Sequence, residues 1–206
     1  MKIDTLCLGD YQTNCYIARA ENASGCVVID PGYQPERVLA WLQAVGRKLD
    51  AILLTHGHFD HVGGVEALVK ATGCRVFMGQ GDYSQRKNPM NDYIYPLHDR
   101  TFPAFDFCEE GETISAGGLT FVTMETPGHT WGSVCYLCGD ALFSGDTLFA
   151  GSCGRIDLPG GDRTAMGQSL ARLSEIQGDY RVFPGHGPAT TLSEERRFNP
   201  YLKGIV

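Results

Sequence analysis

Thr55-His56-Gly57-His58-Phe59-Asp60-His61 is the most informative segment of this chain. It holds three of the 6 histidines found among 206 residues, with a carboxylate between them, so background composition explains it poorly. Neutral imidazole and carboxylate are donors that suit zinc, and also iron or manganese. The residue types therefore predict a metal site that needs no cysteine.

The spacing of these donors indicates a loop. Ligands at i, i+2 and i+4 cannot all lie on one helical face, where neighbours are three or four residues apart, so the helical H-E-x-x-H arrangement is excluded. The apolar run Ala51-Ile52-Leu53-Leu54 precedes the stretch, and a helical pattern over 62–71 follows it. We therefore expect a strand-to-helix loop, which is where α/β proteins place their sites. The alternative is three surface histidines with no ligand role.

The composition fits one globular domain over residues 1–206 with a full core, since 43% of the residues are hydrophobic; a compact two-layer pair is the alternative. The formal charge of -7 argues against a basic patch that binds nucleic acid or a membrane surface. The chain shows no signal-peptide pattern and no apolar run of about 18 residues. We expect a cytoplasmic protein without membrane or nucleic-acid partners.

The cysteines are expected to be free thiols, because no export signal accompanies them and the core needs no disulfides. Cys135 and Cys138 have C-x-x-C spacing, but on a strand this odd separation points the two sulfurs to opposite faces. We therefore interpret both as small hydrophobic residues buried in the core. Cys153 differs because it lies in a Gly-rich loop. The full set is Cys7, Cys15, Cys26, Cys74, Cys108, Cys135, Cys138 and Cys153.

Alternating and helical apolar patterns predict the other elements. Strands at 3–8, 12–19 and 25–30 form a meander, and a helix begins at Pro35 and ends at Gly46. After the metal loop and its helix, a strand completes a strand-helix-strand unit, which implies a sheet covered by helices. The later elements are strands at 75–78, 119–124, 133–137, 141–143 and 180–183 and a helix at 165–176.

Residues 79–110 show no clear periodicity and carry scattered aromatic side chains. Long loops in compact domains are often functional, so a lid or pocket wall is one interpretation, and an ordinary surface excursion is the other. His98 lies here without a histidine or carboxylate partner at ligand-like spacing, which disfavours it as a ligand.

Further polar residues follow predicted strands. His129, Asp146 and His186 each come directly after a glycine at such a junction. A histidine in a turn is usually only a turn residue, but a loop with four donors needs more ligands and a bridging group to hold two metals, and these three residues fill the vacancies. Asp30 is either a carboxylate beside the metals or a turn residue before Pro31-Gly32.

These residues together resemble the metallo-β-lactamase fold superfamily, whose motif spans positions 56 to 186 here. More narrowly, the segments 126–133 and 145–155 resemble the glyoxalase II group, and 155–162 resembles a loop shared by its short bacterial relatives and the persulfide dioxygenases. The tail, from Gly185-His186-Gly187-Pro188 to 199–202, is similar to the short relatives. Glyoxalase II proper carries a C-terminal helical region for glutathione, whereas only 20 residues follow His186. The reaction type therefore transfers better than the substrate.

The resemblance implies an α/β protein with an αββα four-layer sandwich and a metal centre at one edge of its two sheets. It implies two divalent ions, with zinc expected and iron or manganese as alternatives. Residue by residue, it assigns His56, His58 and His129 to the first ion, Asp60, His61 and His186 to the second, and Asp146 to a bridge between them.

The activity expected from this resemblance is hydrolysis of a thioester or similar acyl compound by a hydroxide that bridges the two ions. The catalytic residues are then Asp60, which orients the hydroxide, and Asp146, which fixes the metal spacing. The partner is a small anionic acyl-thiol substrate. Arg155 either binds that anion or forms a structural ion pair.

Three other functions compete with hydrolysis. His56, His129 and Asp146 could form a mononuclear iron site in an oxidoreductase of the persulfide dioxygenase kind. RNA or DNA processing on the same fold is disfavoured by the acidic charge. A non-catalytic metal-binding protein is disfavoured because no expected ligand is missing.

Overall fold

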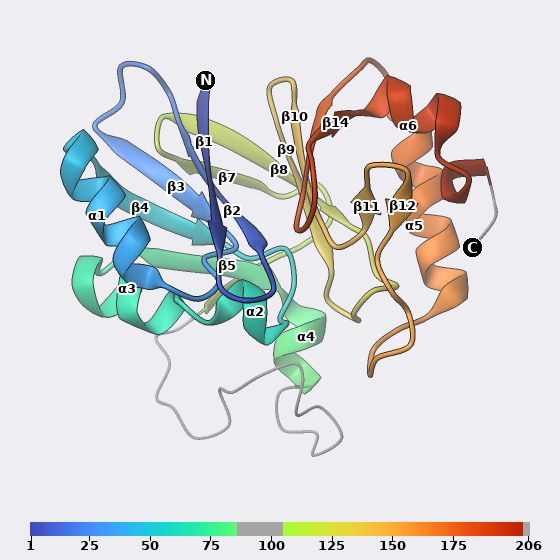
Figure 1. Cartoon of the computed structure of the whole chain (residues 1–206), viewed down its shortest axis with the longest axis horizontal. Helices are drawn as coiled ribbons and strands as arrows, with labels where there is room; N and C mark the ends of the chain where they lie inside the picture. The colour runs from blue at the N-terminus through green and yellow to red at the C-terminus, as the bar shows by residue number, and fades with distance from the viewer. Residues whose placement is uncertain (86–104, 204–206) are drawn as a thin grey trace.

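A computed structural model describes residues 1–85 and 105–203 as two six-stranded sheets packed face to face, with helices on both outer faces (Figure 1). In the first sheet the strands keep their chain order. The first three pair antiparallel and the last four parallel. Its members are β1 (Lys2–Leu8), β2 (Thr13–Arg19), β3 (Gly25–Ile29), β4 (Lys48–Leu53), β5 (Arg75–Gly79) and β6 (Phe105–Cys108).

The second sheet has the strand order β14-β13-β10-β9-β8-β7. All its pairs are antiparallel except β10 with β13, which are parallel and are joined through helix α5 (Arg163–Glu175). Its strands are β7 (Thr113–Ala116), β8 (Leu119–Glu125), β9 (Val134–Cys138), β10 (Ala141–Gly145), β13 (Arg181–Pro184) and β14 (Thr190–Thr191).

Smaller elements complete the layers. Helices α1 (Pro35–Val45) and α3 (Val65–Thr72) cover the outer face of the first sheet, and α5 and α6 (Leu192–Phe198) cover that of the second (Figure 1). The others are α2 (Phe59–Val62), α4 (Gln80–Gln85), the short pair β11 (Leu148–Phe149) and β12 (Ser152–Cys153), and a 3-10 turn at Tyr201–Lys203. No helix in the described ranges is long and apolar enough to cross a membrane.

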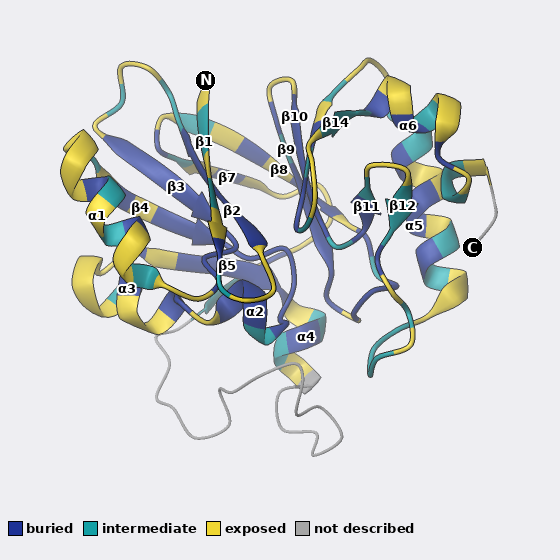
Figure 2. Cartoon of the chain, in the orientation of Figure 1, coloured by how far each residue is buried: buried dark blue, intermediate teal, exposed yellow. Residues whose placement is uncertain are grey.

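Three apolar clusters hold the four layers together, because alternate residues of each strand point to opposite sides. Tyr136 and Phe143 belong to the cluster between the two sheets, whereas Val28 packs under α1 and α3, and Leu142 under α5. The central strands β2, β3, β9 and β10 are therefore buried on both faces, and the helices are buried on one face only (Figure 2). This arrangement confirms the predicted αββα sandwich.

The cysteines behave as the sequence predicts. All eight are free thiols. Cys135 lies in the cluster under α5 and Cys138 in the cluster between the sheets, so the two sulfurs do point to opposite faces of β9. A redox or metal-binding pair is therefore excluded at this C-x-x-C spacing.

The helix predicted over 62–71 is present as α3, but it begins at Val65 and not at Val62. Gly63-Gly64 separates it from the short helix α2, which the sequence did not predict. A Cβ on Gly64 would lie 2.7 Å from the carbonyl oxygen of Gly32 and 2.8 Å from that of Pro31, and the Gly64 amide donates to Pro31. This close backbone approach breaks the helix, and apolar periodicity does not record it.

The prediction of an irregular region over 79–110 is partly wrong, since α4 and β6 lie within this range. Gln80–Gln85 is too short and polar to show helical periodicity, and β6 is a four-residue edge strand. Residues 86–104, with the proposed lid and His98, lie outside the described residues. The expectations missed β7, β11, β12, β14 and α6, which are short or polar.

Candidate metal centre

The predicted donors meet at one edge of the sandwich, beyond the ends of four strands. His56 and His58 follow β4, His129 follows β8, Asp146 follows β10 and His186 follows β13. Four strands that end at the same edge bring together loops that are more than a hundred residues apart in sequence. The structure thus brings all seven predicted residues into one site.

Three histidines form the first donor group. His58 Nδ1 lies 3.0 Å from His56 Nε2 and 2.8 Å from His129 Nε2. All three side chains are buried, and one nitrogen of each lies within 4.8 Å of the others. Ligands of a tetrahedral zinc, bonded at about 2.0–2.1 Å, are about 3.3 Å apart, so this group fits a metal ion.

The second donor group contains Asp60, His61 and His186. Asp60 Oδ2 lies 3.6 Å from His61 Nε2 and 3.2 Å from His186 Nε2, and the two imidazole nitrogens are 3.3 Å apart. These separations also match those between ligands of one ion.

Asp146 contacts both groups. Its Oδ2 lies 3.5 Å from His129 Nε2 and its Oδ1 lies 3.5 Å from His61 Nε2. Within the described chain, the buried Oδ1 has no hydrogen-bond partner. A buried polar atom is normally satisfied, so this oxygen is suited to bind a cation. Gly185 makes room for it, since a Cβ there would lie 2.1 Å from Oδ1.

Asp30 fills both roles that the sequence left open. It adopts φ 50° before Pro31-Gly32, as a turn residue, and it is 2% exposed. Its Oδ1 accepts from the Thr55 amide at 2.8 Å, while Oδ2 accepts from the Thr55 hydroxyl at 2.6 Å and contacts His61 Nδ1 at 2.9 Å. A carboxylate behind a ligand histidine fixes the ring and makes it a stronger donor.

The other ring nitrogens are held in the same way. His129 Nδ1 lies 2.7 Å from the Arg155 carbonyl oxygen and His186 Nδ1 lies 3.1 Å from that of Tyr11. A carbonyl can only accept, so each Nδ1 carries a proton, and in the neutral ring each Nε2 presents a lone pair to the site.

Electrostatics keep His56 and His58 neutral. Burial and the neighbouring His129 lower the pKa of His58 to about 3. Burial, with His61 and His58 nearby, also holds the pKa of His56 well below its ordinary value. Neutral imidazole is the form that binds a metal, so these two residues are ready to do so at neutral pH.

The second group instead gathers negative charge. Burial alone would lower the pKa of His61, but Asp146 and Asp30 outweigh it and raise the pKa to about 9. Burial opposes ionisation of Asp60, yet hydrogen bonding to His186 and the charge of His61 hold the pKa of that carboxyl well below its usual range. The carboxylates therefore require positive charge, which a divalent cation supplies in place of protons.

Asp82, in α4, is a buried carboxylate that sequence analysis missed. Its Oδ2 accepts from the Gly57 amide and the Thr130 hydroxyl, both at 2.8 Å, and its Oδ1 accepts from the Gly132 amide at 2.7 Å. Burial raises the pKa of this carboxyl. Asp82 thereby joins the loop of His56 to that of His129. Its surroundings, Gly81 and a six-residue polar helix, carry no recognisable signal.

The donors open into a pocket of about 520 Å³. Arg155 and Cys153 both line it, as do several aromatic side chains. The Arg155 guanidinium pairs with Asp157 through two contacts of 2.7 Å, which is the ion pair that the sequence offered as one alternative. Burial raises the pKa of the Cys153 thiol, so it is not a thiolate at neutral pH.

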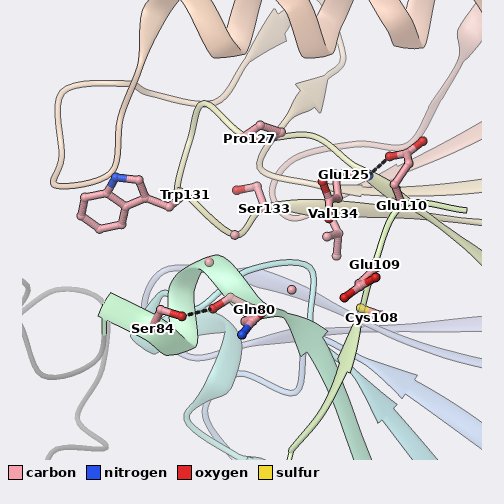
Figure 3. Close-up of a pocket in the computed structure, with 13 residues that line it drawn as sticks. Gln80, Ser84, Cys108, Glu109, Glu110, Glu125, Pro127, Trp131, Ser133 and Val134 are labelled. Atoms are coloured by element: carbon pink, nitrogen blue, oxygen red, sulfur yellow. Dashed lines mark hydrogen bonds between the residues drawn. The ribbon is translucent and has the colours of Figure 1, made fainter. Parts of the chain in front are cut away.

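A second pocket, of about 500 Å³, lies behind the loop that carries His129 (Figure 3). Trp131 stands at one end, and Glu109, Glu110 and Glu125 stand at the other (Figure 3). It contains none of the predicted donors, and no described histidine lines it. The metal centre therefore belongs to the first pocket.

Comparisons with known proteins match this geometry. The family model described as Metallo-beta-lactamase superfamily matches residues 8–186. Hydroxyacylglutathione hydrolase GloC of Haemophilus influenzae is 30% identical over 98% of both chains. The probable polyketide biosynthesis zinc-dependent hydrolase PksB of Bacillus subtilis is 31% identical over 92% of this chain and 81% of its own.

Two solved structures share the whole fold. TTHA1623 in a di-iron-bound form is 40% identical, with a TM-score of 0.83 over 97% of this chain and 100% of its own. The B3 metallo-beta-lactamase BLEG-1 is 32% identical, with a TM-score of 0.86 over 98% of this chain and 100% of its own.

Proposed function

The chain belongs to the metallo-beta-lactamase superfamily, and from this premise we propose that it is a binuclear metal-dependent hydrolase of thioesters, similar to hydroxyacylglutathione hydrolases. The observation that carries the proposal is the pair of three-donor groups with Asp146 in contact with both. Such an arrangement suits two cations that share one carboxylate.

We assign the first ion to His56, His58 and His129 and the second to Asp60, His61 and His186. Zinc is the expected metal, which the zinc-dependent relative supports, and the di-iron-bound relative supports iron as the alternative. When bound, two such ions lower the pKa of a shared water and polarise the substrate carbonyl.

The chain's own residues supply the remaining chemistry. Asp60 stays ionised at neutral pH, and its Oδ2 is fixed by the Thr13 hydroxyl at 3.0 Å, so the carboxylate can accept a hydrogen bond from an attacking water and orient it. Cys153 is a neutral thiol and is not assigned as a nucleophile. A thiolate leaves without help from a general acid, so the site needs no such residue for a thioester.

Arg155 is proposed to contact the anionic thiol portion of the substrate at the rim. It lines the pocket and is exposed, which suits a rim contact. Its pairing with Asp157 means that any such contact adds to an existing ion pair. Replacement by alanine is therefore expected to raise KM and leave kcat within about threefold.

The test is a panel of acyl-thioesters assayed on protein of measured metal content. Hydrolysis by the wild type is expected, together with loss of turnover by at least about 1000-fold in His58→Ala and Asp60→Ala. Asp140→Asn is the matched control, because this carboxylate lies in a surface turn paired with Arg181. Folding is checked by circular dichroism. Full thioesterase activity in either site variant contradicts the assignment.

The second candidate is a mononuclear iron oxidoreductase that uses His56, His129 and Asp146. The observation in its favour is the di-iron-bound relative, which shows that a similar chain accepts iron. Metal analysis with an oxygen-uptake assay on glutathione persulfide separates the two: one iron per chain with oxygen consumption favours the oxidoreductase. A chromogenic cephalosporin, added because BLEG-1 is similar, tests for β-lactam hydrolysis in the same assay series.

A further inference from the structure

The walls of the metal pocket differ from its floor. Histidine and aspartate donors form the floor, whereas Tyr11, Phe59, Phe149 and Leu158 line the walls. Tyr11 and Phe59 come from the β1–β2 turn and the start of α2, and their rings pack edge to face with centroids 5.0 Å apart. Phe149 comes from β11, and the centroid of its ring lies 6.3 Å from that of the His186 ring. Apolar side chains from both halves of the sandwich thus surround the metal donors.

Charge on these walls is already balanced. Across the described ranges 1–85 and 105–203, Arg155 is the only lysine or arginine that lines the pocket, and its guanidinium is paired with Asp157. A negatively charged acyl group between the aromatic walls would meet no side-chain cation there other than Arg155, which already pairs with Asp157, and burial of an unpaired charge is unfavourable. An uncharged apolar group gains free energy in the same space.

The apolar lining and the size of the pocket suit the acyl part of a thioester. A volume of about 520 Å³ suits a small ligand. The thiol portions of biological thioesters are peptides, pantetheine derivatives or carrier proteins, which are large and polar and extend into solvent. The acyl group is the part that fits between the walls when the carbonyl lies over the donors.

We propose that the pocket selects thioesters with an uncharged, apolar acyl group, which packs between Phe149 and Leu158 on one side and Tyr11 and Phe59 on the other. This inference rests on the proposed thioester hydrolysis. Specificity then comes from apolar contact with the acyl chain, and not from ion pairing with it.

The first experiment compares kcat/KM for acetyl, butyryl, hexanoyl and succinyl esters of one thiol. We expect kcat/KM to rise about fourfold for each added methylene until the pocket is filled, since each buried methylene contributes about 0.8 kcal/mol. The succinyl ester should be hydrolysed about 30-fold or more slowly than the butyryl ester. A flat chain-length profile, or preference for succinyl, overturns the inference.

Variants locate the effect. In Phe149→Ala and Leu158→Ala, the rise in kcat/KM for each added methylene should fall to about twofold or less. Phe198→Ala is the control, because this exposed side chain in α6 does not line the pocket. An unchanged increment in both wall variants contradicts the assignment of these residues.

Binding of n-alkanethiols to the metal-loaded protein, measured by calorimetry, separates this inference from the proposed function. The thiol binds metal whether or not turnover occurs. Affinity that rises with alkyl length in a protein that hydrolyses no thioester leaves the apolar pocket standing and removes the proposed reaction. Hydrolysis without any chain-length dependence in either assay removes the pocket inference alone.

Discussion

Asp30 shows how one residue behind the ligands controls the site. Asparagine at this position has one acceptor oxygen in place of two, so it cannot accept from the Thr55 amide and also from the Thr55 hydroxyl and the His61 ring. We expect Asp30→Asn to weaken metal binding at the second group by about 10- to 100-fold. Competition with a chromophoric chelator measures this affinity. Asp140→Asn, at the surface, should leave the affinity unchanged.

His61 predicts how the metal-free protein responds to pH. The pKa of His61 in the folded protein, about 9, lies above its ordinary value of 6.5. The protonated ring therefore stabilises the folded state fully below about pH 6.5, and this contribution is lost as the pH rises towards 9. The raised pKa of His186 acts in the same direction. The free energy of unfolding should fall over this window by at most about 1.4 kcal/mol per pH unit for each proton.

Urea unfolding of chelator-treated protein at several pH values tests this slope. The metal-loaded protein is the control, because coordination displaces the protons and removes the slope. Metal-free protein that becomes more stable between pH 6.5 and 9 contradicts the charge balance described for the second group.

At the scale of elements, α4 fixes the relation between two ligand loops. The Asp82 carboxylate accepts hydrogen bonds both from the loop of His56 and from that of His129. Asp82→Asn loses at least one of these acceptors in a buried place, so we expect a loss of about 1–3 kcal/mol in unfolding free energy. We also expect weaker binding at the first donor group.

Thermal unfolding and metal titration of Asp82→Asn measure both effects. Asp106→Asn is a suitable control, because that carboxylate is half exposed and pairs with Arg75 at the surface. If the variant loses stability but binds metal as tightly as the wild type, α4 supports the fold without positioning the ligands.

Strong periodicity made most elements predictable. The strands buried on both faces and helix α1, with Pro35 at its start and Gly46 in the αL conformation at its end, follow the sequence pattern closely. The break between α2 and α3 at Gly64 does not follow from the sequence pattern, because it is caused by a contact with residues 31–32, which are distant in sequence. Short elements such as β11 and β12 have too few residues for any period to show.

At the scale of the whole molecule, the candidate site was predictable because its donors are rare residue types at strand ends. All seven predicted donors meet, and the two sheets supply them from both halves of the sandwich. The supporting residues were harder to predict. Asn14, for example, donates to the carbonyl oxygens of Pro184 and Gly187 and so holds the loop of His186. Such a contact depends on β2 and β13 meeting in three dimensions, and Asn14 itself is an ordinary strand residue.

The number of metal ions per chain follows from the proposal that two donor groups share Asp146. Metal analysis of purified protein saturated with zinc and then dialysed should give two ions per chain for the wild type and for Asp140→Asn, and one or fewer for Asp146→Asn. One ion per chain in the wild type, unchanged in Asp146→Asn, contradicts the account.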